Sequence, residues 1–218
     1  MQRQGKTSRR SPTSQRLERL LEELEHVFLR DGFLHYRTED LARRLHCSKR
    51  ALYQVAPSRE RLFEVVIERW LAKLRRAGVE ADAGAEDPLE AVTGYLGAAV
   101  IATRDAGSQF VRDLSRSPAT YRRLMSHQRE RIAGLERLIE RGTRTGDFRG
   151  VHPKLVAEVM LNAVAQMVDP ELLARVGLTM SQAFAELYDI VEHGLRPNNG
   201  TRAARRRRTG RRTTRRGS

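Results

Sequence analysis

Residues 38–60 constrain the fold of this chain more than any other segment, because their pattern predicts two short helices joined by a tight turn. Thr38 is a suitable N-cap for the first helix, and the acidic residues that follow it suit the positive end of a helix dipole. His46 and Cys47 form the predicted turn, and Ser48 is expected to cap a second helix. Two short helices separated in this way indicate a helix-turn-helix, in which the second helix enters the major groove of DNA.

The second helix is predicted to begin at Lys49 and to have two different faces. Its inward face is small or apolar and consists of Ala51, Leu52 and Val55. Its outward face carries side chains that can contact DNA, namely Lys49, Arg50, Tyr53 and Gln54. The alternative is a solvated basic surface on a helical domain.

Charge is distributed unevenly along the 218 residues, whose formal net charge is +14. Residues 1–13 carry four basic residues and no acid, and residues 201–218 carry nine arginines and no acid. Residues 14–78 are mildly basic, whereas residues 79–197 have 14 basic and 17 acidic residues. We expect a basic disordered arm at 1–13, a helix-turn-helix domain at 14–78, a helical domain at 79–197 and a disordered arginine-rich tail at 198–218. A basic end joined to a slightly acidic body favours nucleic acid as a partner.

The remaining pattern is helical, so the predicted fold class is all-α. Leucines and other apolar residues recur at three- and four-residue steps in residues 17–28, 62–74, 121–139, 155–167 and 184–195. Further helices are expected from Pro88 to about Arg104 and near 108–114. Residues 78–88 are rich in glycine and acid and are predicted to be a loop, and residues 142–150 and Asp169-Pro170 are predicted to end helices.

The chain contains one cysteine, no long apolar run and no signal peptide, which together predict a cytoplasmic protein. Cys47 is expected to be a small apolar filler rather than a redox switch. The six histidines lack metal-ligand spacing, so no metal and no other cofactor is predicted. No nucleophile and base pattern and no phosphate-binding glycine loop is present, so we expect the chain not to be an enzyme.

Several spaced features together resemble one known family. Gly32-Phe33, Thr38, Cys47-Ser48, Leu52-Tyr53, Ser58-Arg59-Glu60 and Leu62 match the pattern of the tetracycline repressor (TetR/AcrR-type) family of bacterial transcription regulators. The likeness covers residues 14–75, and a weaker one continues to residue 197 through TGDFRG at 145–150 and a closing LYDIVEHGLRP. Ala56, Val55 and Arg59 depart from the family pattern.

The resemblance implies a ligand-responsive repressor that binds a palindromic operator as a homodimer. Arg50 and Lys49 are candidates for guanine contacts, and Gln54 for adenine. Thr38, Tyr53 and Arg59 match positions that resemble phosphate anchors, and Arg43, Arg44 and Ser48 complete the predicted DNA-binding set.

The resemblance also implies a dimer contact through residues 152–167 and 179–195, and a small-molecule inducer pocket within residues 88–168. The predicted pocket residues are Tyr95, Phe110, Leu114, Tyr121, Met125, Gln128, Met160, Asn162, Gln166 and Met167. Each of these residues also suits a hydrophobic core, so the alternative is that they pack inside the domain and contact no ligand.

The arginine-rich tail has two interpretations. It is either a solvated segment or an arm that adds non-specific affinity for DNA. The arm interpretation supports a different class of function, an architectural protein that coats DNA through its arms.

Overall fold

A computed structural model of the chain describes residues 12–197, and all the regular structure in that range is helical. The predicted all-α class is confirmed. The helices are α1 (Pro12–Asp31), α2 (Thr38–Arg44), α3 (Lys49–Val55), α4 (Arg59–Gly84), α5 (Pro88–Ala102), α6 (Ser108–Arg116), α7 (Pro118–Thr145), α8 (Pro153–Gln166), α9 (Pro170–Val176) and α10 (Met180–Leu195). The predicted N-terminal arm, apart from residues 12 and 13, and the arginine-rich tail lie outside the described residues.

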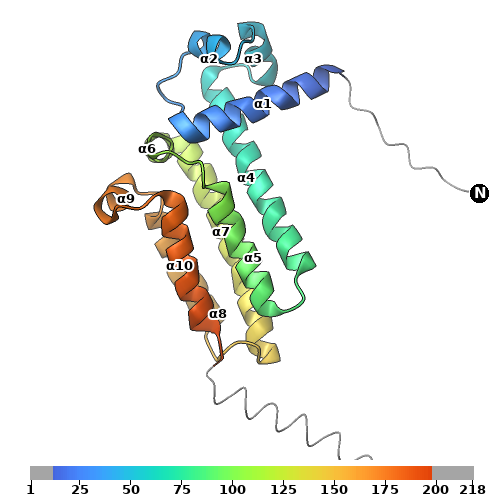
Figure 1. The fold of residues 1–218 in the computed structure, drawn as a ribbon, viewed down its shortest axis with the longest axis vertical. Coiled ribbons are helices and arrows are strands. Elements are labelled where there is room, and N and C mark those ends of the chain that lie inside the picture. The colour runs from blue at the N-terminus through green and yellow to red at the C-terminus, as the bar shows by residue number, and fades with distance from the viewer. Residues whose placement is uncertain (1–11, 198–218) are drawn as a thin grey trace, which may run out of the picture.

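The helices form a small head and a long bundle (Figure 1). Helices α1 to α3 gather at one end of the molecule, and α4 leaves this head and runs down the long axis beside α5 and α7. Helix α8 packs on α7, and α10 packs on α5. The structure therefore has an N-terminal helix-turn-helix unit followed by a C-terminal helical bundle.

Local capping explains most of the helix starts. The Ser58 hydroxyl accepts a hydrogen bond from Arg61 N at 3.1 Å, and the Asp87 carboxylate accepts from Leu89 N and Glu90 N just before α5. The Thr179 hydroxyl accepts from Gln182 N at 3.2 Å. Each cap satisfies an amide that the first turn of a helix leaves without a partner.

Four predicted details are wrong. Thr38 is the first residue of α2 and not its cap, and the Asp40 carboxylate instead accepts from Arg37 N at 3.2 Å. The predicted loop at 78–88 is helical as far as Gly84, because Gly78 is buried in the packing of the bundle. Helix α7 continues past residue 142 to Thr145. Finally, a short helix, α9, begins at Pro170, where the sequence indicated only a helix end.

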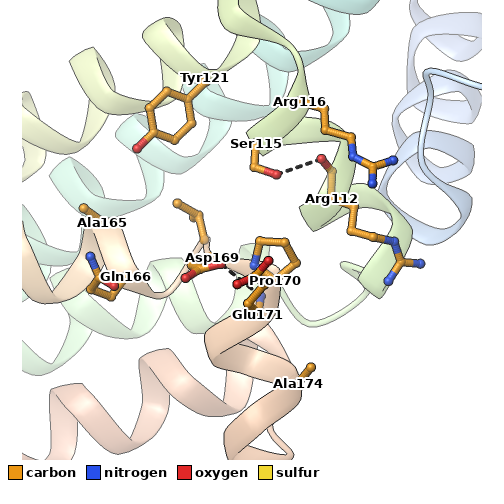
Figure 2. Close-up of a pocket in the computed structure, with 11 residues that line it drawn as sticks. Arg112, Ser115, Arg116, Tyr121, Ala165, Gln166, Asp169, Pro170, Glu171 and Ala174 are labelled. Carbon is orange, nitrogen blue, oxygen red and sulfur yellow. Dashed lines mark hydrogen bonds between the residues drawn. The ribbon is translucent and has the colours of Figure 1, made fainter.

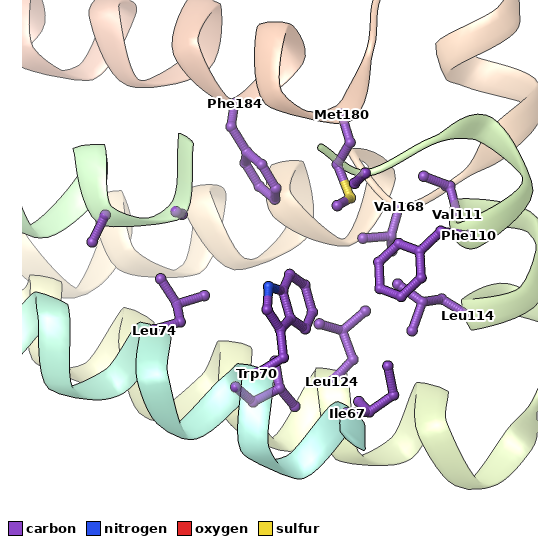
Figure 3. Packing of buried hydrophobic residues seen from close by; sticks show 14 of the residues in the cluster. Ile67, Trp70, Leu74, Phe110, Val111, Leu114, Leu124, Val168, Met180 and Phe184 are labelled. Atoms are coloured by element: carbon purple, nitrogen blue, oxygen red, sulfur yellow. The ribbon is translucent and has the colours of Figure 1, made fainter. Parts of the chain in front are cut away.

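A continuous hydrophobic core joins the head to the bundle. Figure 3 shows part of this core inside the bundle, around Trp70 of α4 and Phe110 of α6. Phe33 in the head lies edge-on to Phe110 of α6, with ring centroids 6.2 Å apart, and Phe110 lies edge-on to Trp70 of α4 at 5.5 Å. The Trp70 indole N–H donates to Ala102 O at 3.0 Å, so the polar atom of this buried ring is satisfied.

One buried carboxylate holds the connection between α1 and α2 to α6. Asp113 is 1 % exposed, and its Oδ2 accepts hydrogen bonds from Phe33 N at 2.6 Å and Leu34 N at 2.9 Å. Gly32 has a φ of +82°, and a Cβ there would lie 2.6 Å from Asp113 Oδ2. Glycine is therefore required at this point both by the backbone conformation and by the close approach.

We expect Asp113→Ala to destabilise the fold, because it leaves the amides of residues 33 and 34 without acceptors. The cost is about 1–3 kcal/mol for each amide that stays buried. Chemical denaturation would measure it, with Asp105→Ala as the control because Asp105 is exposed. Equal stability of the two variants would contradict the anchoring role of Asp113.

Candidate nucleic-acid interface

The turn between α2 and α3 is built as the sequence predicts. His46 has a φ of 47°, in the left-handed region, and Cys47 N donates to Ala42 O at 2.9 Å. The Ser48 hydroxyl accepts from Ala51 N at 3.2 Å and caps α3. These bonds fix the angle at which α3 leaves the turn.

Helix α3 turns its small apolar side toward the head and its polar side toward solvent. Ala51 and Leu52 are buried, and Val55 packs against the core while partly exposed. Lys49, Arg50, Tyr53 and Gln54 are all exposed, in agreement with the predicted outward face.

The exposed basic residues near α3 differ in how far they are already paired. Lys49 Nζ lies 2.8 Å from Glu39 Oε1 on α2, and this hydrogen bond raises the pKa of Lys49 and lowers the pKa of Glu39. Arg50 and Gln54 make no hydrogen bond or ion pair with any of residues 12–197. Arg50 is therefore the free cation of this face within the described chain.

Other residues of the predicted DNA-binding set lie beside α3, and the three arginines among them have partners within the protein. Arg43 pairs with Asp40 at 3.4 Å, and Arg44 pairs with Asp31. The Arg59 guanidinium donates to Tyr36 O at 3.4 Å. Thr38 is partly buried in the first turn of α2.

Sequence reasoning missed two basic residues on α1. Arg16 and Arg19 line a pocket of about 510 Å³ between α1 and α3, together with Gln54 and Cys47. Their spacing of three residues and their exposure beside an apolar stripe were the signals for a basic helix face. Burial raises the pKa of the Cys47 thiol, which favours the apolar-filler interpretation of this residue.

A second pocket lies in the bundle, between α6, the start of α7 and the connection from α8 to α9 (Figure 2). Its volume is about 670 Å³, and two of the predicted inducer contacts, Tyr121 and Gln166, line it. The other lining residues are Arg112, Ser115, Arg116, Ala165, Val168, Asp169, Pro170, Glu171 and Ala174. The guanidinium groups and the carboxylates come from different elements, so the lining carries both signs of charge.

The other predicted inducer contacts do not line this pocket. Phe110, Leu114, Gln128 and Met160 are buried in the bundle, and Met125 and Met167 are partly buried. Asn162 is exposed, and its side chain donates to Glu158 O in its own helix at 2.8 Å. Tyr95 donates to Arg131 O at 2.9 Å. The sequence pattern predicted apolar helix faces correctly but could not tell a pocket wall from a core.

In the part of the chain that the structure describes, no cluster of three or more His, Cys, Asp or Glu residues could hold a metal ion. None of the helices between residues 12 and 197 is long and apolar enough to span a membrane.

Comparison of sequences finds no matching family model and no matching curated protein. Comparison of structures does find neighbours. A TetR-family transcriptional regulator from Agrobacterium tumefaciens superposes with a TM-score of 0.66 at 16% identity, over 85% of this chain and 100% of that one. A transcriptional regulator from Saccharomonospora viridis, in complex with choline, superposes with a TM-score of 0.67 at 16% identity, again over 85% and 100% of the two chains. PfmR, a TetR-family regulator from Thermus thermophilus, is 23% identical, with a TM-score of 0.58 over 82% of this chain and 100% of its own. The chain therefore has the fold of the TetR-family transcriptional regulators.

Proposed function

We propose that the chain is a DNA-binding transcriptional regulator that acts as a homodimer and responds to a small molecule. The observation that carries this proposal is the outward face of α3, which presents Arg50, Tyr53 and Gln54 to solvent at one end of the molecule. A short helix whose polar side projects from a helix-turn-helix fits the major groove. Arg16 and Arg19 beside it add positive charge for the phosphates.

The free guanidinium of Arg50 is the best candidate for reading a base, because guanine offers two acceptors in the major groove. Gln54 has the donor and acceptor that adenine requires. Lys49 would exchange Glu39 for the DNA, so it contributes less net affinity than an unpaired lysine. Arg43, Arg44, Arg59 and Thr38 surround α3 and suit phosphate contacts, which position the helix without reading sequence.

A homodimer is supported by apolar side chains on the outside of α8 and α10. Leu155 and Val159 on α8 and Ile190 on α10 are mostly exposed, although each is large and apolar. Burial of these faces against a second copy of the chain would remove them from water. A twofold dimer would place two copies of α3 about one DNA turn apart, on the order of 34 Å or somewhat more, which suits a near-palindromic operator.

A small-molecule response is supported by the pocket of Figure 2 and by the neighbour solved with choline. Helix α6 forms one wall of this pocket through Arg112, Ser115 and Arg116, and the same helix holds the α1–α2 connection through Asp113. A ligand that binds one position of α6 better than another would shift the population of dimers whose recognition helices fit DNA.

The nine arginines of residues 201–218 support a second candidate, an architectural protein that coats DNA through its arms. The two functions differ in sequence preference. A regulator reads bases through α3, whereas an arm that only neutralises phosphates binds all sequences alike.

Selection of genomic fragments by the full chain and by a chain that ends at Pro197 would decide between them. We expect both to recover the same short palindrome. The shorter chain should bind with a shallower salt dependence, since each phosphate contact that the tail makes contributes about 0.9 to the log–log slope. If the chain that ends at Pro197 no longer binds DNA and neither chain recovers a motif, the architectural function would be favoured.

Arg50→Ala should weaken operator binding more than binding to random DNA. Loss of a base contact costs about 1–3 kcal/mol, which is roughly a 5-fold to 150-fold loss of affinity. Fluorescence anisotropy with operator and scrambled duplexes would measure both affinities. Arg122→Ala is the matched control, because Arg122 is an exposed arginine on α7 in the bundle. Equal losses of operator affinity in the two variants would show that Arg50 does not contribute to base recognition.

Val159→Glu should convert the dimer to a monomer, because it places a charge within the proposed apolar interface. Val79→Glu is the control, since Val79 on α4 is 65% exposed and Val159 is 60% exposed. Light scattering after size-exclusion chromatography would give the mass of each variant. A dimeric Val159→Glu protein would exclude this face as the interface.

A further inference from the structure

The arginine-rich tail (residues 198–218) begins at the end of the bundle opposite to the helix-turn-helix. Helix α10 runs antiparallel to α5, because the Ser181 hydroxyl at its start donates to Val100 O near the end of α5 at 2.8 Å. Leu195, the last residue of α10, accepts from Arg149 N in the connection from α7 to α8 at 3.0 Å. Since α5 begins where α4 ends, α10 ends at the same end of the bundle as α4, away from the head (Figure 1).

The length of α4 sets the distance between this end and the DNA-facing helix. Helix α4 has 26 residues, which at 1.5 Å per residue span about 39 Å. Helix α3 lies beside the start of α4 in the head. A helix with its side chains is about 10–12 Å across, so DNA in contact with α3 lies on the order of 50 Å from the end of α10.

Most of the tail arginines cannot reach that DNA. Five of the nine lie between Arg202 and Arg208. Arg208 is 13 positions beyond Leu195, and a fully extended chain of this length spans at most about 45 Å. The other four, between residues 211 and 216, reach the operator only if the chain runs straight along the whole bundle. The tail is therefore badly placed to bind the DNA that α3 contacts.

The bundle end at which the tail begins carries further exposed arginines. Arg144 lies in the last turn of α7, Arg149 lies in the connection that follows, and Arg196 comes directly after α10. All three are exposed. The Arg149 guanidinium donates to Gly194 O, a neutral acceptor that does not cancel its charge. Basic residues thus continue from the bundle end into the tail.

Several carboxylates at the same end are engaged within the protein. Asp82 pairs with Arg141 at 2.6 Å, and Asp87 accepts hydrogen bonds from two amides in the first turn of α5. Glu90 accepts from Glu86 N at 2.8 Å. These groups hold the connection between α4 and α5, so they are poor partners for the tail.

The composition of the tail fits duplex DNA better than other polyanions. Residues 198–218 contain nine arginines and no aromatic residue, and alanine is their only apolar side chain. Aromatic side chains stack on the bases of single strands, and apolar side chains anchor basic segments in membranes. Arginine alone is enough to neutralise the phosphates of a duplex and to enter a narrow minor groove.

We propose that the tail binds a second DNA duplex on the side of the dimer away from the operator, so that the protein bridges two DNA segments. This inference rests on the proposed function, because two copies of α3 on one operator place both tails on the opposite side. Operator DNA cannot curve back to the tails over a short distance, since a duplex has a persistence length of about 150 bp. The second segment is therefore a distant part of the same DNA or a separate molecule.

A capture assay with two duplexes would test the bridge. The first duplex carries only the palindrome that the chain ending at Pro197 recovers, and it is fixed to beads. A labelled duplex of scrambled sequence is added after unbound protein is washed away. Both chains should bind the beads equally. The full chain should retain the labelled duplex, and the shorter chain should retain at least roughly 10-fold less, because it lacks the phosphate contacts of the tail.

Full-length variants with matched charge would locate this effect in the tail. Replacement of Arg205–Arg208 by glutamine should lower the log–log salt slope for the labelled duplex by up to about 3.6, at about 0.9 for each of four lost phosphate contacts. Affinity for the short operator duplex should not change, because it is too short to supply the second segment. The control replaces four exposed arginines of the bundle by glutamine and should retain the labelled duplex as the wild type does: Arg104, Arg122, Arg129 and Arg175.

Equal retention by the full chain and by the chain ending at Pro197 would overturn the proposal, and so would an equal loss in the control variant. Preferential retention of single-stranded RNA, or of vesicles that contain phosphatidylserine, would assign the tail a different partner. Weaker binding of the short operator duplex by the tail variant would place the tail on the operator itself. If the shorter chain recovers no palindrome, the proposed function fails together with the bridge, whereas intact operator binding without capture refutes the bridge alone.

Discussion

The position of the head on the bundle depends on one buried carboxylate. Asp113 accepts three hydrogen bonds, two from the backbone that leads from α1 to α2 and one from Gln109 of its own helix at 2.7 Å. Gly107 N adds a bond to Leu29 O at 2.8 Å, so the start of α6 is fixed to the end of α1. Because the other side of α6 lines the pocket of Figure 2, the head and the pocket share one helix. A displacement of α6 cannot leave the α1–α2 connection in place without breaking these bonds.

Several arginines of the head and upper bundle are held by carboxylates. Arg69 of α4 pairs with Glu18 of α1 at 2.7 Å, and Arg123 of α7 pairs with Glu64 of α4 at 2.8 Å. Such pairs add little stability singly where they are exposed, but they set which helix faces meet. Arg50 on α3 lacks such a partner within residues 12–197. This unpaired charge therefore lies on the exposed face of α3, where a polyanion can reach it.

Local sequence predicted the α2–turn–α3 unit well, because caps and apolar positions act over a few residues. Ser48 caps α3 as predicted, and Ser58 caps α4 through the same kind of local hydrogen bond. The end of α4 could not be predicted in this way. Gly78 is compatible with a loop on propensity alone, yet in the bundle it provides the close approach of Tyr95 and Arg131. For a related reason, only two of the predicted inducer contacts, Tyr121 and Gln166, line the pocket of Figure 2. An apolar stripe indicates the buried face of a helix, but it does not indicate which part of that face borders a cavity.

The two buried charges of the bundle, Asp113 and Arg131, differ in how the chain treats them. Around Asp113 the fold supplies a donor for each oxygen, with backbone amides from the head and an amide side chain from α6. Among residues 12–197, Arg131 donates to Tyr95 O and interacts with the neutral Tyr188 side chain, but it has no carboxylate partner. Arg131 Nη1 and His127 Nε2 are both buried without a hydrogen-bond partner. An arginine that gained only packing from its place could be replaced by an apolar side chain of similar length without this cost.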